Sequence, residues 1–164
     1  MQDRDTLMAI AQIAATFIGF AGVVFAVESA SSRGVSDRER NAIMNLLMPS
    51  IAVLFIAFVP LVAAAGGGGD VRIWRASNAI IGIVHSVFLT GAFRAALRNQ
   101  LLEPVPVRFL LLGGGSMAVL ANLVIVLGFF SQFAATAFLA GLVWFLLVSA
   151  IQFLMLIVLY VRAA

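Results

Sequence analysis

Five long apolar stretches, separated by short polar segments, dominate the pattern of the chain. They cover approximately residues 7–27, 43–65, 73–93, 109–130 and 137–161. A helix needs about 20 apolar residues to cross a hydrocarbon core of roughly 30 Å, because each residue adds about 1.5 Å. The pattern therefore predicts an all-α polytopic membrane protein, a bundle of five transmembrane helices. We expect a single transmembrane domain over residues 1–164, because the spans leave no room for a soluble domain.

Local signals refine the second stretch. Ser36 and Glu39 have the S-x-x-E form of a capping box, which predicts a helix start near Asp37. Pro49 and Pro60 lie inside the apolar run. Each proline lacks an N–H group and crowds the carbonyl four residues earlier, so we expect a bend or local unwinding.

The third stretch is the most polar of the five, because it contains Arg75, Asn78 and His85. Its length still predicts a full crossing rather than a re-entrant segment. Beyond it, Arg94 and Arg98 lie near Leu97, Leu101 and Leu102. This pattern predicts that the helix continues along the membrane surface.

The distribution of arginine predicts the orientation of the helices. Five crossings place the N-terminus and the second and fourth loops on one side, with Arg4, Arg72 and Arg75. The other side carries seven arginines, at positions 33, 38, 40, 94, 98, 108 and 162. Basic residues accumulate in cytoplasmic loops, so we expect an N-out/C-in topology.

Composition supports the membrane class and excludes several kinds of chemistry. Hydrophobic residues make up 63% of the chain and charged residues 10%, whereas soluble domains are about a quarter charged. Cysteine is absent, which excludes disulfides, thiol catalysis and cysteine-bound metals. The net charge of +3 comes entirely from arginine. We expect these arginines to contact the lipid bilayer and its anionic headgroups rather than nucleic acid.

His85 is the only histidine and lies in the middle of the third stretch. Ionisable groups at membrane depth are costly and are candidate functional sites. A polar path could combine His85 and Asn78 with Asn45, near the proline bend, and with Glu28 at the end of the first stretch. The alternative is a neutral imidazole that is hydrogen-bonded to a neighbouring helix. A haem would need a second axial ligand, so we expect no cofactor and no metal.

Small residues repeat along two of the stretches. Ala11, Ala15, Gly19 and Gly22 follow one another at spacings of three or four, and Gly114 and Ala118 do the same in the fourth stretch. Small-x-x-x-small faces let helix backbones approach closely in lipid. The sequence leaves open whether these faces pack within the bundle or between copies in a homo-oligomer.

Two functional interpretations remain. The first is a structural or accessory membrane protein that associates with itself or with a larger membrane complex. The second is a small oligomeric channel or transporter, proton-linked through His85. Nothing in the sequence supplies the convergent nucleophiles, acids or bases that an enzyme needs, so we expect no enzymatic activity. Without an organellar transit segment, the expected location is the bacterial cytoplasmic (inner) membrane.

Overall fold

The computed structural model describes residues 3–30, 37–67, 69–97 and 104–163, with side chains for all of these except Glu28, Asp37, Arg38 and residues 159–163. Within these ranges the chain forms five long helices and a 3-10 turn, without strands. The helices are α1 (Arg4–Ala30), α2 (Asp37–Ala65), α3 (Asp70–Leu97), α4 (Val105–Val126) and α5 (Ala134–Ala163). All five are long and apolar enough to cross a membrane. The all-α, five-helix expectation is confirmed.

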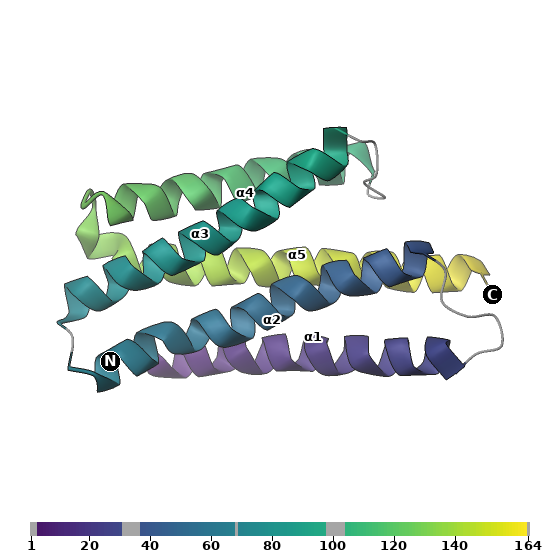
Figure 1. Ribbon diagram of the computed structural model, residues 1–164, viewed down its shortest axis with the longest axis horizontal. Helices are drawn as coiled ribbons and strands as arrows, with labels where there is room; N and C mark the ends of the chain where they lie inside the picture. The colour runs from purple at the N-terminus through teal and green to yellow at the C-terminus, as the bar shows by residue number, and fades with distance from the viewer. Residues whose placement is uncertain (1–2, 31–36, 68, 98–103, 164) are drawn as a thin grey trace.

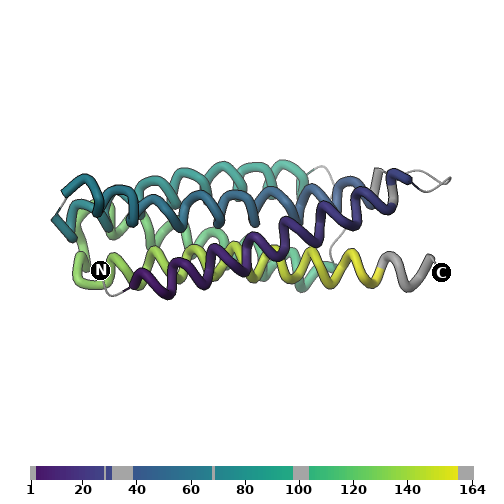
Figure 2. The backbone as a smooth tube through the Cα atoms, turned by 90° about the horizontal axis from the view of Figure 1, so that it is seen from below, coloured from purple at the N-terminus to yellow at the C-terminus, as the bar shows by residue number. Residues whose placement is uncertain are grey.

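Two helical hairpins flank a central helix. Figure 1 shows α1 and α2 on one side of α5, and α3 and α4 on the other. Helix α5 contacts all four of the other long helices. The chain termini lie at opposite ends of the bundle (Figure 2). We call the end at which α1, α3 and α5 begin the N-terminal end, and the end at which they finish the C-terminal end.

The connection between α4 and α5 differs from its sequence prediction. Helix α4 ends at Val126, about one turn earlier than the apolar run. Gly128 and Phe130 have φ values of 96° and 53°, which lie in the left-handed region. The N–H of Phe129 donates to the carbonyl of Val124 at 3.1 Å, closing the helix. Apolarity therefore continues past the point at which the backbone reverses.

Helix α2 runs unbroken through Pro49 and Pro60, so the chain is not unwound there. Both prolines are buried in the bundle. Helix α3 ends at Leu97 within the described residues, so most of the expected surface helix lies outside them. Ser36 of the expected capping box lies outside them too.

The surface of the bundle is largely apolar. Large hydrophobic side chains are exposed on all five helices, including Val23, Phe55, Ile83, Met117 and Leu154, which are 62%, 69%, 65%, 72% and 60% exposed. Soluble monomers rarely expose so much contiguous apolar surface. The surface is therefore compatible with a multi-pass membrane protein.

Candidate functional site

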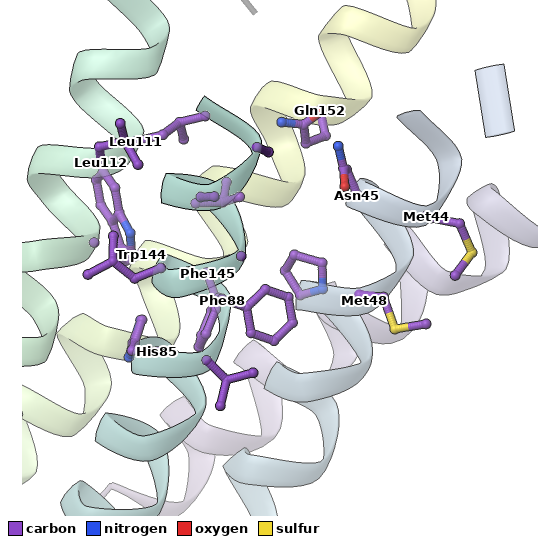
Figure 3. A pocket seen from close by; sticks show the side chains of 18 of the residues that line it. Met44, Asn45, Met48, His85, Phe88, Leu111, Leu112, Trp144, Phe145 and Gln152 are labelled. Atoms are coloured by element: carbon purple, nitrogen blue, oxygen red, sulfur yellow. The ribbon is translucent and has the colours of Figure 1, made fainter. Parts of the chain in front are cut away.

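A cavity of about 540 Å³ lies between α2, α3, α4 and α5 in the half of the bundle toward the C-terminal end. Helices α2 and α3 join at the N-terminal end and diverge toward the other end (Figure 1). Side chains of all four helices line the space between them, and Figure 3 labels ten of these residues. Ala95 and His85 both line the cavity, and the helical rise of α3 separates them by about 15 Å along its depth. The volume falls within the roughly 300–1,000 Å³ that is typical of ligand pockets.

The shallow part of the cavity is polar. Four hydrogen-bonding or charged side chains line it, from three different helices: Asn41, Asn45, Arg108 and Gln152. Asn45 and Gln152 face the same space in Figure 3. Arg108 and Gln152 also interact with other residues of the chain. Among the described residues that line the cavity, Arg108 is the only charged one.

The deep part of the cavity is aromatic. The ring of His85 stacks on Phe145 with centroids 4.0 Å apart and planes 4° apart. Phe88 meets the same Phe145 ring edge-on, with centroids 5.2 Å apart. Trp144 is the fourth ring of this region, and all four rings are labelled in Figure 3. The cavity therefore changes from amide-lined and cationic to aromatic over its depth.

His85 is 3% exposed, yet its hydrogen-bonding capacity is unused. Neither Nδ1 nor Nε2 has a hydrogen-bond partner among the described residues. The backbone of Ile81, one turn earlier on α3, interacts with the ring without meeting hydrogen-bond geometry. Leaving a buried polar group unbonded costs about 1–3 kcal/mol. Both nitrogens are enclosed by the protein, although the residue lines the cavity.

Trp144 takes its position from a glycine on the facing helix. A Cβ atom at Gly114 of α4 would overlap the six-membered part of the Trp144 indole. The absence of a side chain at this position lets the indole lie against the backbone of α4. Gly114 therefore shapes the wall of the cavity as well as the α4–α5 contact.

The cavity is closed toward the N-terminal end. Beyond His85 the bundle is filled by Val53, Ile81, Phe138 and Leu142, each fully buried. Next to Pro49, the Ser50 hydroxyl donates to Leu46 O at 2.8 Å and is 3.0 Å from the Ser149 hydroxyl. These buried side chains close the deep end of the cavity.

A lateral opening lies between α2 and α3. Met44 and Met48 on α2 and Val87 on α3 line the cavity and are 39%, 44% and 66% exposed, and Val87 also lines a second groove between α3 and α4. Flexible, polarisable methionine side chains adapt readily to different contact shapes. The cavity is therefore accessible from the side of the bundle.

The predicted polar path is only partly assembled. Asn45 and His85 line the same cavity. Asn78 does not line it. Its Nδ2 donates to Ala134 O at the start of α5 at 2.8 Å and to Trp74 O of its own helix at 2.7 Å. Glu28 lies in α1, and its side chain is outside the described part of the structure.

The predicted small-residue faces separate into two groups. Ala11 is 4% exposed and belongs to the core, whereas Ala15, Gly19 and Gly22 are exposed. A Cβ atom at Gly19 or Gly22 would meet nothing within 4 Å. On α4, Gly114 contacts Trp144, while Ala118 is half-buried and accepts a hydrogen bond from Asn122. The α1 face is thus largely unused within the chain.

A second depression, a groove between α3 and α4, has a volume of about 880 Å³. Its hydroxyl groups bond within their own helix, Ser86 to Gly82 O at 2.8 Å and Thr90 to Ser86 O at 2.7 Å. The Oδ1 atoms of Asn78 and Asn122 are the unbonded buried atoms of residues that line it. Arg94 is the one charged residue among the described residues that line the groove.

Sequence reasoning did not identify Arg108, Trp144, Phe145 and Gln152 as parts of one site. Each occupies an unremarkable position on its own helix, and the four come together only through the packing of α4 against α5. The sequence carries one signal for this site. Arg108 lies in the first turn of the fourth span, and the amide of Gln152 lies near the end of the fifth. Among the described residues, no three His, Asp or Glu side chains are grouped as a metal site would require.

Comparison with known proteins found no matching family model, no matching curated protein and no matching solved structure.

Proposed function

We propose that this protein is an integral membrane protein that binds a small amphipathic ligand in the cavity between α2, α3, α4 and α5. The observation that carries the proposal is a cavity of about 540 Å³ that is aromatic at its deep end and lined by amides and one arginine at its shallow end. A deep apolar wall with a few converging polar groups is typical of ligand sites. The proposal also assigns no catalytic role to the protein.

The closed N-terminal end favours binding over an open pore. Val53, Ile81 and Leu142 fill the bundle beyond the cavity, so a solute that enters has no described route onward. A transporter cycle would require these helices to separate at the N-terminal end. Transport therefore remains the alternative function, in which the same cavity would open in turn to each side of the membrane.

The proposed setting is a bacterial inner membrane, with the C-terminal end of the bundle in the cytoplasm. Arg40, Arg94 and Arg108 lie at the C-terminal end, and Arg4, Arg72 and Arg75 lie at the N-terminal end. The excess of arginine in the sequence that flanks the C-terminal end favours this orientation. The ligand would then enter from the cytoplasm or from the inner leaflet.

Native mass spectrometry of gently extracted protein tests ligand binding. We expect wild-type protein to carry a small-molecule adduct that differs in mass from the detergent. Ala92→Phe places a ring in the cavity and should remove the adduct, whereas Ala96→Phe, on the same helix but outside the cavity, should keep it. A wild type without an adduct, or an adduct that survives Ala92→Phe, would show that this cavity is not a ligand site.

A second candidate function, association through α1, has its own supporting observation. Ala15, Gly19 and Gly22 are exposed, and Gln12 on the same face is exposed as well. Small residues permit close helix approach, and an amide in lipid favours a hydrogen bond to another helix. The protein would then act as an accessory subunit, in a homo-oligomer or in a larger membrane complex.

The mass of the extracted complex tests this second function. Gly19→Leu should shift an oligomer toward the monomer, because the larger side chain separates the α1 backbones. Gly113→Leu is a matched control, since Gly113 on α4 is also exposed with nothing within 4 Å of its Cβ position. A monomeric wild type, or equal effects of the two substitutions, would argue against association through α1.

A further inference from the structure

The two halves of the cavity differ in chemistry, and this difference specifies a ligand. Resting on the proposed ligand-binding function, we infer that the ligand is a single-chain amphiphile with an anionic headgroup, taken up from the surrounding lipid. The headgroup lies at Arg108, and the chain extends past Phe88 and Phe145 toward His85. In addition to binding, this specifies the charge of the ligand and its direction in the cavity.

The charge follows from the residues at the shallow end. Arg108 supplies a fixed positive charge, and the amides of Asn41 and Asn45 supply N–H donors. No described lining residue is acidic. Asn41 and Arg108 also lie close to the beginnings of α2 and α4, where aligned backbone dipoles favour negative charge. Arg108, which also interacts within the chain, and the two helix dipoles favour an oxyanion over a cation, and the amides can donate to that oxyanion.

The chain follows from the residues at the deep end. Below the amides, the walls of the cavity are formed by Leu111, Leu112, Trp144 and Val148, together with the stacked rings. An extended hydrocarbon chain buries its surface against such walls, and apolar burial favours binding by about 25 cal/mol per Å². At about 15 Å deep, the cavity spans half of a roughly 30 Å hydrocarbon core.

The source follows from the lateral opening. Met44, Met48 and Val87 line the cavity and are partly exposed on the surface of the bundle. In the proposed membrane setting this opening faces acyl chains, so a chain can enter sideways while its headgroup stays near the interface. A small water-soluble anion would use the polar end alone and would leave the aromatic half unfilled.

Tryptophan fluorescence offers a direct test, because the chain contains two tryptophans. In a Trp74→Phe background, Trp144 reports from the cavity wall. We would titrate the detergent-solubilised protein with the dibrominated forms of oleate, oleyl alcohol and oleylamine, whose bromine atoms quench a nearby indole. We expect saturable quenching by all chains that enter, with oleate bound at least roughly tenfold more tightly than the alcohol, since a charge-assisted hydrogen bond contributes at least that factor. The amine should bind most weakly.

Variants separate the headgroup site from general surface charge. Arg108→Gln should remove the preference for oleate over the alcohol, and Arg108→Lys should retain much of it. Arg94→Gln, a matched loss of charge on α3 outside the cavity, should leave the preference unchanged. Excess acetate should not release bound oleate.

The other outcomes separate a failure of the anionic-lipid inference from a failure of the binding function. Equal binding of oleate and the alcohol, equal effects of Arg94→Gln and Arg108→Gln, or release by acetate would overturn the inference about an anionic lipid while leaving the binding function intact. Quenching that does not saturate for any probe, or that Ala92→Phe does not reduce, would overturn both.

Discussion

The imidazole of His85 lies flat against the ring of Phe145, with centroids 4.0 Å apart and planes 4° apart. This stack holds the plane of the imidazole by an apolar contact, while both of its nitrogens stay unbonded. A Cβ atom at Gly141, on the same helix as Phe145, would come within 3.2 Å of His85 Cε1. Helix α5 therefore positions the imidazole through Phe145 and Gly141 and forms no hydrogen bond with its nitrogens.

His85→Phe should maintain or raise stability and leave ligand binding intact. The substitution keeps an aromatic ring against Phe145 and removes two buried nitrogens that lack partners, so the free energy of unfolding should stay equal or rise by up to about 1 kcal/mol. The small-molecule adduct expected in native mass spectrometry should persist, because a hydrocarbon chain packs against a phenyl ring as well as against an imidazole. Denaturant unfolding in detergent measures the first effect. A clear loss of stability would show that the imidazole is bonded within the folded chain.

Gly114→Ala should disturb the wall of the cavity. The new methyl group would overlap Trp144, and forcing a side chain aside in a packed contact costs about 1–3 kcal/mol. Trp144 emission, measured in a Trp74→Phe background, should shift at the same time. Gly113→Ala adds a methyl group into open space and should be neutral or slightly stabilising, because alanine favours helix. Equal behaviour of the two variants would contradict the described α4–α5 packing.

Ser50 and Ser149 should show a small energetic coupling. Their hydroxyl oxygens are 3.0 Å apart in a buried contact between α2 and α5. Interhelical hydrogen bonds in membrane proteins contribute about 0.6 kcal/mol on average. A double-mutant cycle with Ser50→Ala and Ser149→Ala should give a coupling near that value. Strict additivity would mean that the Leu46 carbonyl alone satisfies Ser50.

Arg75→Gln should loosen the end of α4. The Arg75 Nη2 donates to the Val126 carbonyl at 2.7 Å, and the last carbonyls of a helix otherwise lack partners. A cation at a helix C-terminus is also favourable. Hydrogen exchange of residues 123–129 should accelerate several-fold, while Arg72→Gln, which removes a neighbouring charge, should have little effect. Unchanged exchange in Arg75→Gln would show that the contact is not formed in solution.

The sequence predicted the elements of this fold because membrane-spanning helices can be recognised from their length and apolarity. It did not predict the end of α4, since Leu127, Phe129 and Phe130 are apolar residues in a turn whose geometry depends on Gly128. It also did not predict which face of α1 is buried. Nearly every position of α1 is apolar or small, so hydropathy alone does not distinguish Ala14, which is buried, from Ala15, which is exposed.

The site was harder to predict than the fold for a similar reason. His85 and Asn45 stood out as polar residues inside apolar runs, and both line the cavity. Asn78 stood out equally, but it serves the contact with α5 by bonding to Ala134 O. The aromatic half of the cavity had no sequence signal, because Phe145 is one of fourteen phenylalanines and only tertiary packing selects it.

The most direct test of the one-sided cavity is single-cysteine labelling, for which the chain is suited because it contains no cysteine. An anionic methanethiosulfonate reagent would be added to the cytoplasmic side of membrane vesicles carrying Asn45→Cys, Val148→Cys, Val53→Cys or Leu142→Cys. Positions 45 and 148 line the cavity, whereas 53 and 142 lie in the fully buried region beyond it. We predict labelling of the first two variants and none of the last two. Labelling at 53 or 142, or an absence of labelling at both 45 and 148, would contradict a cavity that opens at the C-terminal end and closes beyond His85.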